Sequence, residues 1–419
     1  MTRGIVCLDT RGQTLSDIYQ LLNGFGAGDL FQILRDGVPR TRSELATLTG
    51  FARSTISSRI DELLASGLIT YVSDAVSTGG RPSAQVALNR GARVVASADF
   101  GATHATVALM NLGSEVLAEV TSDRDIALGP EDSLNWLERT IRELLEQVER
   151  PAEDLLAIGI GLPGPVEHST GRPTSPPIMP GWDGYDVPGH LHEAFDVPVL
   201  VDNDVNVMAL GEQAKAWPDV ENMIFIKVSI GIGSGIISGG VLQRGAEGSA
   251  GDIGHIAISR GADRLCRCGN MGCLEALASA PAVAAELAQQ GLDVASPQDL
   301  VCLAKRGDQT TMKTVRQAGR DIGEVLNMCV SMLNPSLIVV GGSFAEHNDV
   351  LIAGIREVVY SRSMPLSTQH LTIASSRVGR EAGVLGAGIM AIDYALAPEQ
   401  LNRANGGPSS YRAVADQVG

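Results

Sequence analysis

The chain has 419 residues, 44% of them apolar, which suffices for two or three domains with large buried cores. No stretch approaches the roughly 20 consecutive apolar residues of a membrane span, and the first 30 residues lack the pattern of a secretory leader, so we expect a cytoplasmic protein that does not enter a membrane. The net charge of −16 is unevenly divided, because residues 1–93 carry ten Arg, no Lys and eight acids. Only this N-terminal part has the charge to approach nucleic acid, whereas the acidic remainder would repel it.

The N-terminal part predicts a winged helix-turn-helix. A helix at 41–49 is followed by Gly50 and by a second helix at 53–66. Two short helices joined by such a tight turn form a helix-turn-helix. The remaining elements expected here are a helix at 28–36 and two strands of the wing at 67–72 and 84–88.

Helix pairs of this kind also occur in proteins that do not bind DNA. Here the second helix carries arginines and short polar side chains, which suit phosphates and base edges, and the wing has an arginine at its tip. We therefore predict a DNA-binding domain at residues 1–90. The residues expected to contact DNA are Arg53, Ser54, Thr55, Ser57 and Arg59 on the helix, and Arg81 on the wing, where it would enter a minor groove.

From residue 94 onward the pattern changes to apolar strands interrupted by glycine. Residues 94–109 and 224–237 each read as a strand, a Gly turn and a second strand. This weak duplication predicts two related α/β lobes with a cleft between them. The N–H groups of such turns can bind phosphate, although Gly hairpins also occur simply as tight turns. Further expected elements are strands at 155–161, 197–201 and 337–340, helices within 280–333 and at 380–396, and a flexible tail at 398–419.

A polar segment, Asp202-Asn203-Asp204, directly follows the strand predicted at 197–201. Proteins of the α/β class place their chemistry at such strand ends. A carboxylate there can take a proton from a sugar hydroxyl as a general base, or accept a hydrogen bond in recognition. All three residues are also good helix caps, so capping is an equally open interpretation.

His255 and three cysteines, Cys266, Cys268 and Cys273, supply the four ligands of a tetrahedral zinc site. The alternative is a set of reduced, buried cysteines, but a Cys-x-Cys-Gly-x-x-Gly-Cys loop is a poor core segment. With four protein ligands the site is closed, so a structural ion is predicted rather than a source of hydroxide. Glu275, two residues after the last ligand, would be held rigidly by the ion.

Together with the winged helix-turn-helix, residues 94–396 resemble the ROK family of repressors and sugar kinases, specifically its DNA-binding repressor branch. The resemblance rests on the segments 99–103 and 229–235, on Asn203-Asp204, and on Gly251-Asp-Ile-Gly-His255 with the cysteine loop. It implies a two-lobed domain of actin-like, sugar-kinase ATPase type at residues 91–397, followed by the tail.

The same resemblance implies roles for individual residues. Asp204 would be the catalytic base if the chain is a kinase. The implied sugar ligands are Asn203, Asp204, Asp252, His255 and Glu275, and the implied phosphate-binding positions are Asp99, Gly101, Thr103, Gly231, Gly233 and Gly235, with Gly341 and Gly342 in a further glycine loop.

The chain departs from the kinases of the family at both phosphate loops. Ala102 and His104 stand where those kinases have Gly and Lys, and Ile230 stands where they have Thr. The Cβ atoms of Ala102 and Ser229 restrict close approach of the backbone, and Ile230 lacks a hydroxyl. These departures predict weak or absent phosphoryl transfer. On the sugar side, Asp252 replaces a Glu and Ile178 replaces an Asn, which indicates an unusual sugar.

The sequence thus predicts a sugar-responsive transcriptional regulator, most simply a repressor, that binds operator DNA as a homodimer or homotetramer. A sugar or sugar phosphate in the ROK domain would change its affinity for the operator. Two alternatives stay open: a sugar kinase that uses ATP and Mg, and a protein with both activities.

Overall fold

The computed structural model describes residues 25–72, 84–292, 294, 296–346 and 348–404. The tip of the predicted wing, with Arg81, lies outside the described residues. The chain divides into two compact units. The first holds the N-terminal part with Asn111–Glu115 and the C-terminal end, and the second holds Val95–Met110 with Val116–Ala391. None of the described helices is long and apolar enough to cross a bilayer.

The first unit contains the predicted winged helix-turn-helix. Its elements are α2 (Ala27–Leu34), β1 (Arg40–Thr41), α3 (Arg42–Thr49), α4 (Arg53–Ala65), β2 (Ile69–Val72) and β3 (Gln85–Leu88), with an antiparallel sheet in the order β1-β3-β2. Thr41 and Glu44 form a capping box at the start of α3. Gly50 ends α3 in the left-handed conformation, with φ +74°, and so makes the tight turn. Ile56 and Leu63 are buried on the inner face of α4.

The segment predicted as a flexible tail begins with a helix, α15 (Pro398–Ala404), that packs on α2 in the same unit. The side-chain oxygen of Asn402 accepts a hydrogen bond from the N–H of Gly28 over 2.9 Å. The Gln32 side chain donates to the carbonyl oxygen of Leu396 over 2.7 Å, and Leu401 is buried. A few specific contacts therefore order this helix despite its polar composition.

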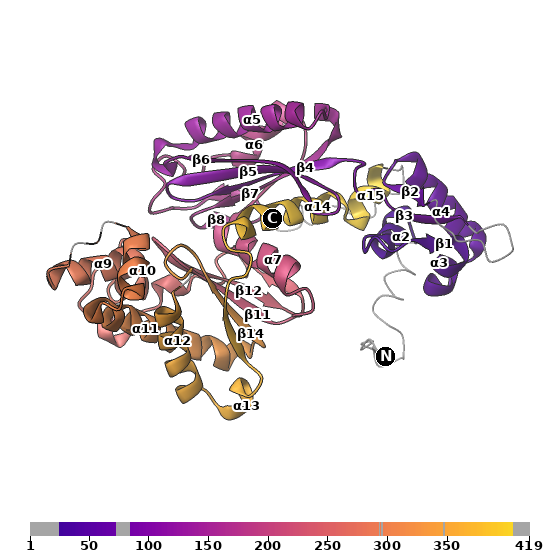
Figure 1. The fold of residues 1–419 in the computed structure, drawn as a ribbon. Helices are drawn as coiled ribbons and strands as arrows, with labels where there is room; N and C mark the ends of the chain where they lie inside the picture. The colour runs from indigo at the N-terminus through magenta and orange to yellow at the C-terminus, as the bar shows by residue number, and fades with distance from the viewer. Residues whose placement is uncertain (1–24, 73–83, 293, 295, 347, 405–419) are drawn as a thin grey trace, which may run out of the picture. The chain divides into compact units, whose positions relative to one another are not determined.

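The second unit is built around two five-stranded sheets (Figure 1). The first consists, in order, of β10 (Val199–Asn203), β7 (Leu155–Leu162), β4 (Val94–Phe100), β5 (His104–Asn111) and β6 (Val116–Asp123), and the second of β15 (Thr372–Ser375), β14 (Leu337–Gly341), β11 (Met223–Val228), β12 (Ile232–Ser238) and β13 (Val241–Gln243). In each sheet the strand that comes first in the chain, β4 or β11, is central. The next two strands of the chain lie on one side of it, and two later strands lie on the other. The shared order confirms the predicted duplication.

Helices surround the two sheets. They are α5 (Pro130–Gln147), α6 (Val187–Phe195), α7 (Asp204–Ala216), α8 (Glu275–Ala278), α9 (Ala280–Gln289), α10 (Pro297–Lys305), α11 (Gln309–Leu333), α12 (Asp349–Arg362), α13 (Pro365–Thr368) and α14 (Glu381–Ala395), and a short ribbon joins β8 (Val166–Glu167) to β9 (Arg172–Pro173). The helices α5 and α6 pack on the first sheet, whereas α11 and α12 pack on each other beside the second.

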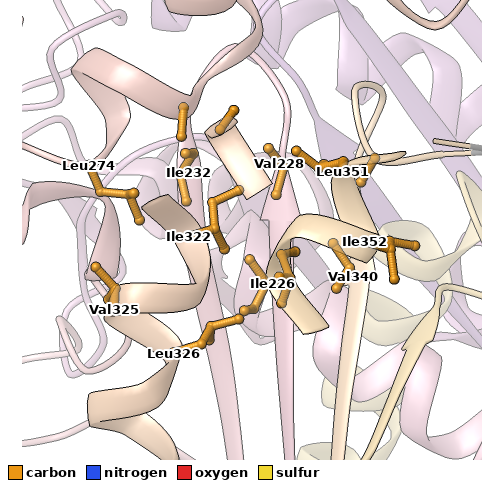
Figure 2. Packing of buried hydrophobic residues seen from close by; sticks show 14 of the residues in the cluster. Ile226, Val228, Ile232, Leu274, Ile322, Val325, Leu326, Val340, Leu351 and Ile352 are labelled. Carbon is orange, nitrogen blue, oxygen red and sulfur yellow. The ribbon is translucent and has the colours of Figure 1, made fainter. Parts of the chain in front are cut away.

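A large apolar core lies between the second sheet and the helices α11 and α12 (Figure 2). Ile226 of β11 and Val340 of β14 contribute from the sheet, and Ile322 of α11 and Leu351 of α12 contribute from the helices. Burial of such side chains stabilises a fold by about 1.5–3 kcal/mol each. This core therefore holds the second sheet, and the loops at its edge, in a fixed position.

The helices α7 and α14 join the two lobes of this unit. A Cβ at Gly211 of α7 would collide with the carbonyl oxygen of Ala382, and one at Gly386 of α14 with that of Val207. The two helix backbones therefore touch. Because α7 contacts strands of both sheets, its N-terminus is fixed relative to each lobe.

Candidate functional site

Asn203 and Asp204 lie where β10 ends and α7 begins. The Oδ1 atom of Asn203 accepts a hydrogen bond from the N–H of Val205 over 3.0 Å, and its Nδ2 donates to the carbonyl oxygen of Gly164 over 2.9 Å. The capping interpretation is therefore confirmed for Asn203. Asp204 is buried in the first turn of α7, where the helix dipole favours its negative charge.

The carboxylate of Asp202 is bound by other side chains of the protein. Its Oδ2 accepts a hydrogen bond from Nε of Arg244 over 2.6 Å, and its Oδ1 accepts one from the side chain of Asn206 over 2.8 Å. Asp202 lies in the first sheet, whereas Arg244 directly follows β13 of the second. This ion pair, buried at Asp202 and partly exposed at Arg244, therefore connects the two lobes beside the predicted sugar ligands.

Lys227 is a site residue that the sequence analysis missed. Its ammonium forms an ion pair with the carboxylate of Asp204. Burial lowers the pKa of Lys227, but the charge and hydrogen bond of Asp204 and the charge of Asp99 outweigh this and raise it above its usual value. Lys227 is a lone charge inside the apolar strand β11. That placement is the signal that could have found it, because lysine is rarely buried without a partner.

Asp99 lies beside this ion pair, near the end of β4. A Cβ at Gly161 of β7 would lie 3.2 Å from Oδ1 of Asp99 and 3.5 Å from the Cα of Asp204. The Asp99 carboxylate also lies against Gly383 in the first turn of α14. Burial raises the pKa of Asp99 to about 7, a rise that the charge of Lys227 opposes and that of Asp204 increases.

Several of the glycines predicted to bind phosphate lie in close contact with other parts of the protein. The ring of His104 covers Gly101, where a Cβ would lie 2.9 Å from the Nδ1 atom. A Cβ at Gly235 would lie 2.6 Å from a methyl group of α7, and one at Gly342 would lie 2.6 Å from the carbonyl oxygen of Val228. Among the other predicted positions, Gly233 faces Val205, Gly231 faces Glu275, Gly341 faces Phe225 and Thr103 is exposed.

Two further predicted sugar ligands, Asp252 and His255, lie on a segment that packs against the strand β12. The N–H of Ser234 donates to the carbonyl oxygen of Gly251 over 2.9 Å, and a Cβ at Gly251 or Gly254 would collide with the β12 backbone. Gly251 also has φ +97°, a conformation that favours glycine. This close approach places Asp252 and His255 beside β12, with 3.9 Å between Oδ1 of Asp252 and Nε2 of His255.

Glu275, the first residue of α8, reaches the same strand. Its Oε2 accepts a hydrogen bond from the N–H of Ile232 over 3.1 Å. Lys227, the partner of Asp204, pairs with Gly233 in the β11–β12 register, one residue further along β12. Four predicted sugar ligands, Asp204, Asp252, His255 and Glu275, are therefore attached to one hairpin, and Asn203 precedes the first of them.

His255, Cys266, Cys268 and Cys273 form a cluster whose four ligand atoms all lie within 4.8 Å of one another. The sulfurs of Cys268 and Cys273 are 3.7 Å apart, and the sulfur of Cys266 lies 3.7 Å from Nδ1 of His255. Tetrahedral coordination with metal–sulfur bonds of about 2.3 Å separates the sulfurs by about 3.8 Å. The four residues could therefore hold one metal ion.

The loop that carries the cysteines is anchored to the second lobe. Arg260 donates through Nε to both carboxylate oxygens of Asp321 in α11, over 3.0 Å each. Leu274 and Leu277 are buried in the core between the second sheet and α11. These contacts anchor both ends of the loop independently of a metal ion.

The predicted DNA contacts in the first unit fall into two groups. Arg53 and Ser54 are exposed at the start of α4, and Ser57 is partly exposed one turn later. Arg59 is held within the unit, because its Nη1 pairs with Glu62 over 2.7 Å and its Nε donates to a backbone carbonyl oxygen over 3.2 Å. Thr55 is partly exposed beside the first group.

Asp99→Asn should stabilise the protein more at pH 8 than at pH 5. The folded-state pKa of Asp99, about 7, lies above its ordinary value of 3.8, so the folded state holds this proton more tightly than the unfolded state. Stability from the protonated carboxyl is complete below pH 3.8 and is lost as the pH rises toward 7, whereas an amide does not titrate. The gap in melting temperature between variant and wild type should therefore widen up to about pH 7 and then level off.

The matched control for this pH series is Asp219→Asn, at an exposed carboxylate. Its effect on the melting temperature should be nearly the same at each pH. A gap between Asp99→Asn and wild type that stays constant or narrows from pH 5 to pH 8 would show that the Asp99 pKa is not raised.

The chain matches the ROK family over residues 95–394. The xylose repressor of Caldicellulosiruptor bescii is 29% identical over 370 residues, which cover 85% of this chain and 92% of that protein. The DNA-binding transcriptional dual regulator NagC of Escherichia coli is 27% identical over 387 residues, which cover 89% and 94%. Both matches extend over more of the chain than the ROK region alone.

The solved structures support the same assignment. A ROK family transcriptional regulator, described as a homolog of the E. coli MLC protein, has a TM-score of 0.79 and 27% identity, and the match covers 90% of this chain and 98% of that one. The ROK hexokinase of Thermus thermophilus has a TM-score of 0.60 and 28% identity, and covers 71% of this chain and 97% of its own. The predicted actin-like, sugar-kinase type of fold is therefore confirmed. The chain belongs to the ROK family, as one of its sugar-responsive transcriptional regulators.

Proposed function

We propose that this protein is a repressor that binds operator DNA through α4 and the wing, as a homodimer or homotetramer, and releases it when a sugar binds beside Asp204. The observation that carries the DNA-binding part is the exposed polar face at the start of α4, opposite the buried Ile56 and Leu63. In a helix-turn-helix this face enters the major groove. Ligand binding would favour an arrangement of the dimer in which the two α4 helices no longer match the operator spacing.

The sugar site is proposed at Asn203, Asp204, Asp252, His255 and Glu275. Carboxylates accept hydrogen bonds from sugar hydroxyls, and the imidazole and amide groups can donate to hydroxyl oxygens. The structure supports this grouping because four of these residues are attached to the β11–β12 hairpin. The relatives are named for xylose and N-acetylglucosamine, so these two sugars come first in any ligand panel.

The residues of the phosphate loops do not fit ATP with Mg. The ring of His104 covers Gly101, and the carboxylate of Glu275 already accepts the N–H of Ile232 in the second loop. A phosphate there would meet a carboxylate instead of a free backbone donor. Phosphoryl transfer depends on such oriented donors and on the metal ion, so we favour a sensor over a kinase.

We infer that zinc is the ion of the His/Cys cluster. Three thiolates and one imidazole are a donor set that zinc prefers, and four protein ligands leave no open position for water. Zinc there would hold the Nδ1 atom of His255 and leave its Nε2 atom on the side of Asp252. Its role would be to orient His255 and Glu275 toward the sugar.

Arg53→Ala should weaken binding to an operator selected from random duplexes by about 1–3 kcal/mol if Arg53 reads a base. If it contacts phosphate, the main effect should be a shallower salt dependence of the binding constant. The matched comparison is Arg59→Ala, which removes a guanidinium already held by Glu62 and should weaken DNA binding less. Fluorescence anisotropy over a salt series measures both, and a larger loss for Arg59→Ala would refute this division.

Purified protein should contain one zinc per chain by elemental analysis. Cys268→Ser should lower the zinc content and weaken the sugar response, because a serine hydroxyl is a poor ligand and the loop would lose its hold on His255. The control is Cys302→Ser, at an exposed cysteine of α10 outside the cluster, which should leave zinc stoichiometric. Well-folded protein with far less than one zinc per chain would disprove the assignment.

Asp204→Asn should weaken sugar-induced release from the operator, because a charged hydrogen bond to a hydroxyl, contributing about 1.5–3 kcal/mol, would be lost. Zinc content and DNA binding without sugar should stay near those of wild type, which shows that the variant is folded. The readout is the sugar concentration that gives half-maximal release. If this concentration is unchanged for every sugar that acts on wild type, Asp204 is not a sugar ligand.

A further inference from the structure

Lys227 is not one of the proposed sugar ligands or DNA contacts, yet its ammonium lies among the charged groups of the site. Its ammonium is paired with Asp204, and its charge also acts on Asp99. The side chain of Asp204 is 8% exposed and that of Lys227 is 23% exposed, so water screens the pair only partly. The negative charges of Asp99 and Asp204 repel each other, and the charge of Lys227 opposes this repulsion.

The ammonium of Lys227 can be compared with the divalent ion of a phosphoryl-transfer site. In phosphoryl transfer a divalent ion neutralises the phosphates, and a carboxylate base must be free to take the proton of the attacking hydroxyl. Here the Asp99 carboxylate lies beside the Cα of Asp204 across Gly161, and at this point Lys227 supplies a positive charge to the carboxylate of Asp204. A divalent ion at that point would face an ammonium that is already bound to one of the two carboxylates it needs.

We propose that Lys227 is a built-in cation that takes the place of a divalent metal ion between Asp99 and Asp204, so that the site binds its sugar without Mg²⁺ or nucleotide. The proposal rests on the sugar site proposed above only in its last clause. The ammonium of Lys227 holds Oδ2 of Asp204, an oxygen that a metal ion or an incoming proton would otherwise use. Lys227 is therefore a positioning residue, and it excludes the metal.

The proposal is tested with Mn²⁺ alone as the probe, on the full-length, zinc-loaded chain. Free Mn²⁺ is counted by electron paramagnetic resonance, and its effect on the melting temperature is measured in parallel. Wild type and Lys227→Arg should not bind Mn²⁺ at this site. Lys227→Gln should gain one Mn²⁺ per chain with at least tenfold higher affinity than wild type, and its melting temperature should rise with Mn²⁺. The double variant Lys227→Gln with Asp99→Asn should lose this gain.

Two results would overturn the proposal. One is tight Mn²⁺ binding by wild type that Asp99→Asn abolishes, because the site would then accept a metal beside Lys227. The other is a Lys227→Gln protein, with stoichiometric zinc, that gains no Mn²⁺; if this variant is unstable, failure of Mn²⁺ to raise its melting temperature counts in the same way. The experiment uses neither sugar nor DNA, so its failure is distinct from failure of the proposed function.

Discussion

Close backbone contact with the strand β12 is the constraint on which the candidate sugar site depends. On β12 itself, Gly233 and Gly235 make room for α7, which carries Asp204 at its start. On the segment that follows β13, Gly251 and Gly254 lie directly against the β12 backbone and bring His255 to it. A Cβ at Gly235, Gly251 or Gly254 would push one of these elements away from the strand. The glycines therefore fix the distances among side chains that lie far apart in the sequence.

The second constraint is electrostatic. Where β10 ends and α7 begins, two acids separated by one residue have different partners: Asp202 pairs with Arg244, and Asp204 pairs with Lys227. Burying a charge is costly unless a partner of opposite charge is close, so removal of either cation would leave a carboxylate in an unfavourable environment. The first pair connects the lobes, and the second sets the charge at the sugar ligands. A sensor requires binding and a change of shape, whereas a kinase requires a free base and a metal, and these charges suit the former.

Local signals predicted the N-terminal unit well. Thr41 caps α3 and Gly50 ends it in the left-handed conformation, so the bounds of α3 follow from short-range chemistry. The repeated glycine hairpin is also a local sequence signal, and it predicted the two lobes. The residue types and spacing of the cysteine loop likewise predicted its cluster with His255.

Long-range contacts were harder to predict. The partner of Asp204, Lys227, lies 23 residues further along the chain on β11, and only its position in an apolar run distinguished it. A phosphate loop and a packing surface both need glycine, so the sequence pattern could not separate these two uses for Gly235 or Gly342. The anchoring of α15 by Asn402 depends on a residue 374 positions earlier. In each case the decisive interaction joins segments that no local pattern relates.

The most direct test of the account is release of the selected operator, measured by fluorescence anisotropy, during titration with free sugars in buffer without nucleotide or Mg²⁺, with ADP production followed separately after both are added. The account predicts that at least one free sugar releases the DNA without either addition, and that no sugar supports turnover near the 1 per second or above of ordinary kinases. Release that requires ATP and Mg²⁺, together with such turnover, would contradict it.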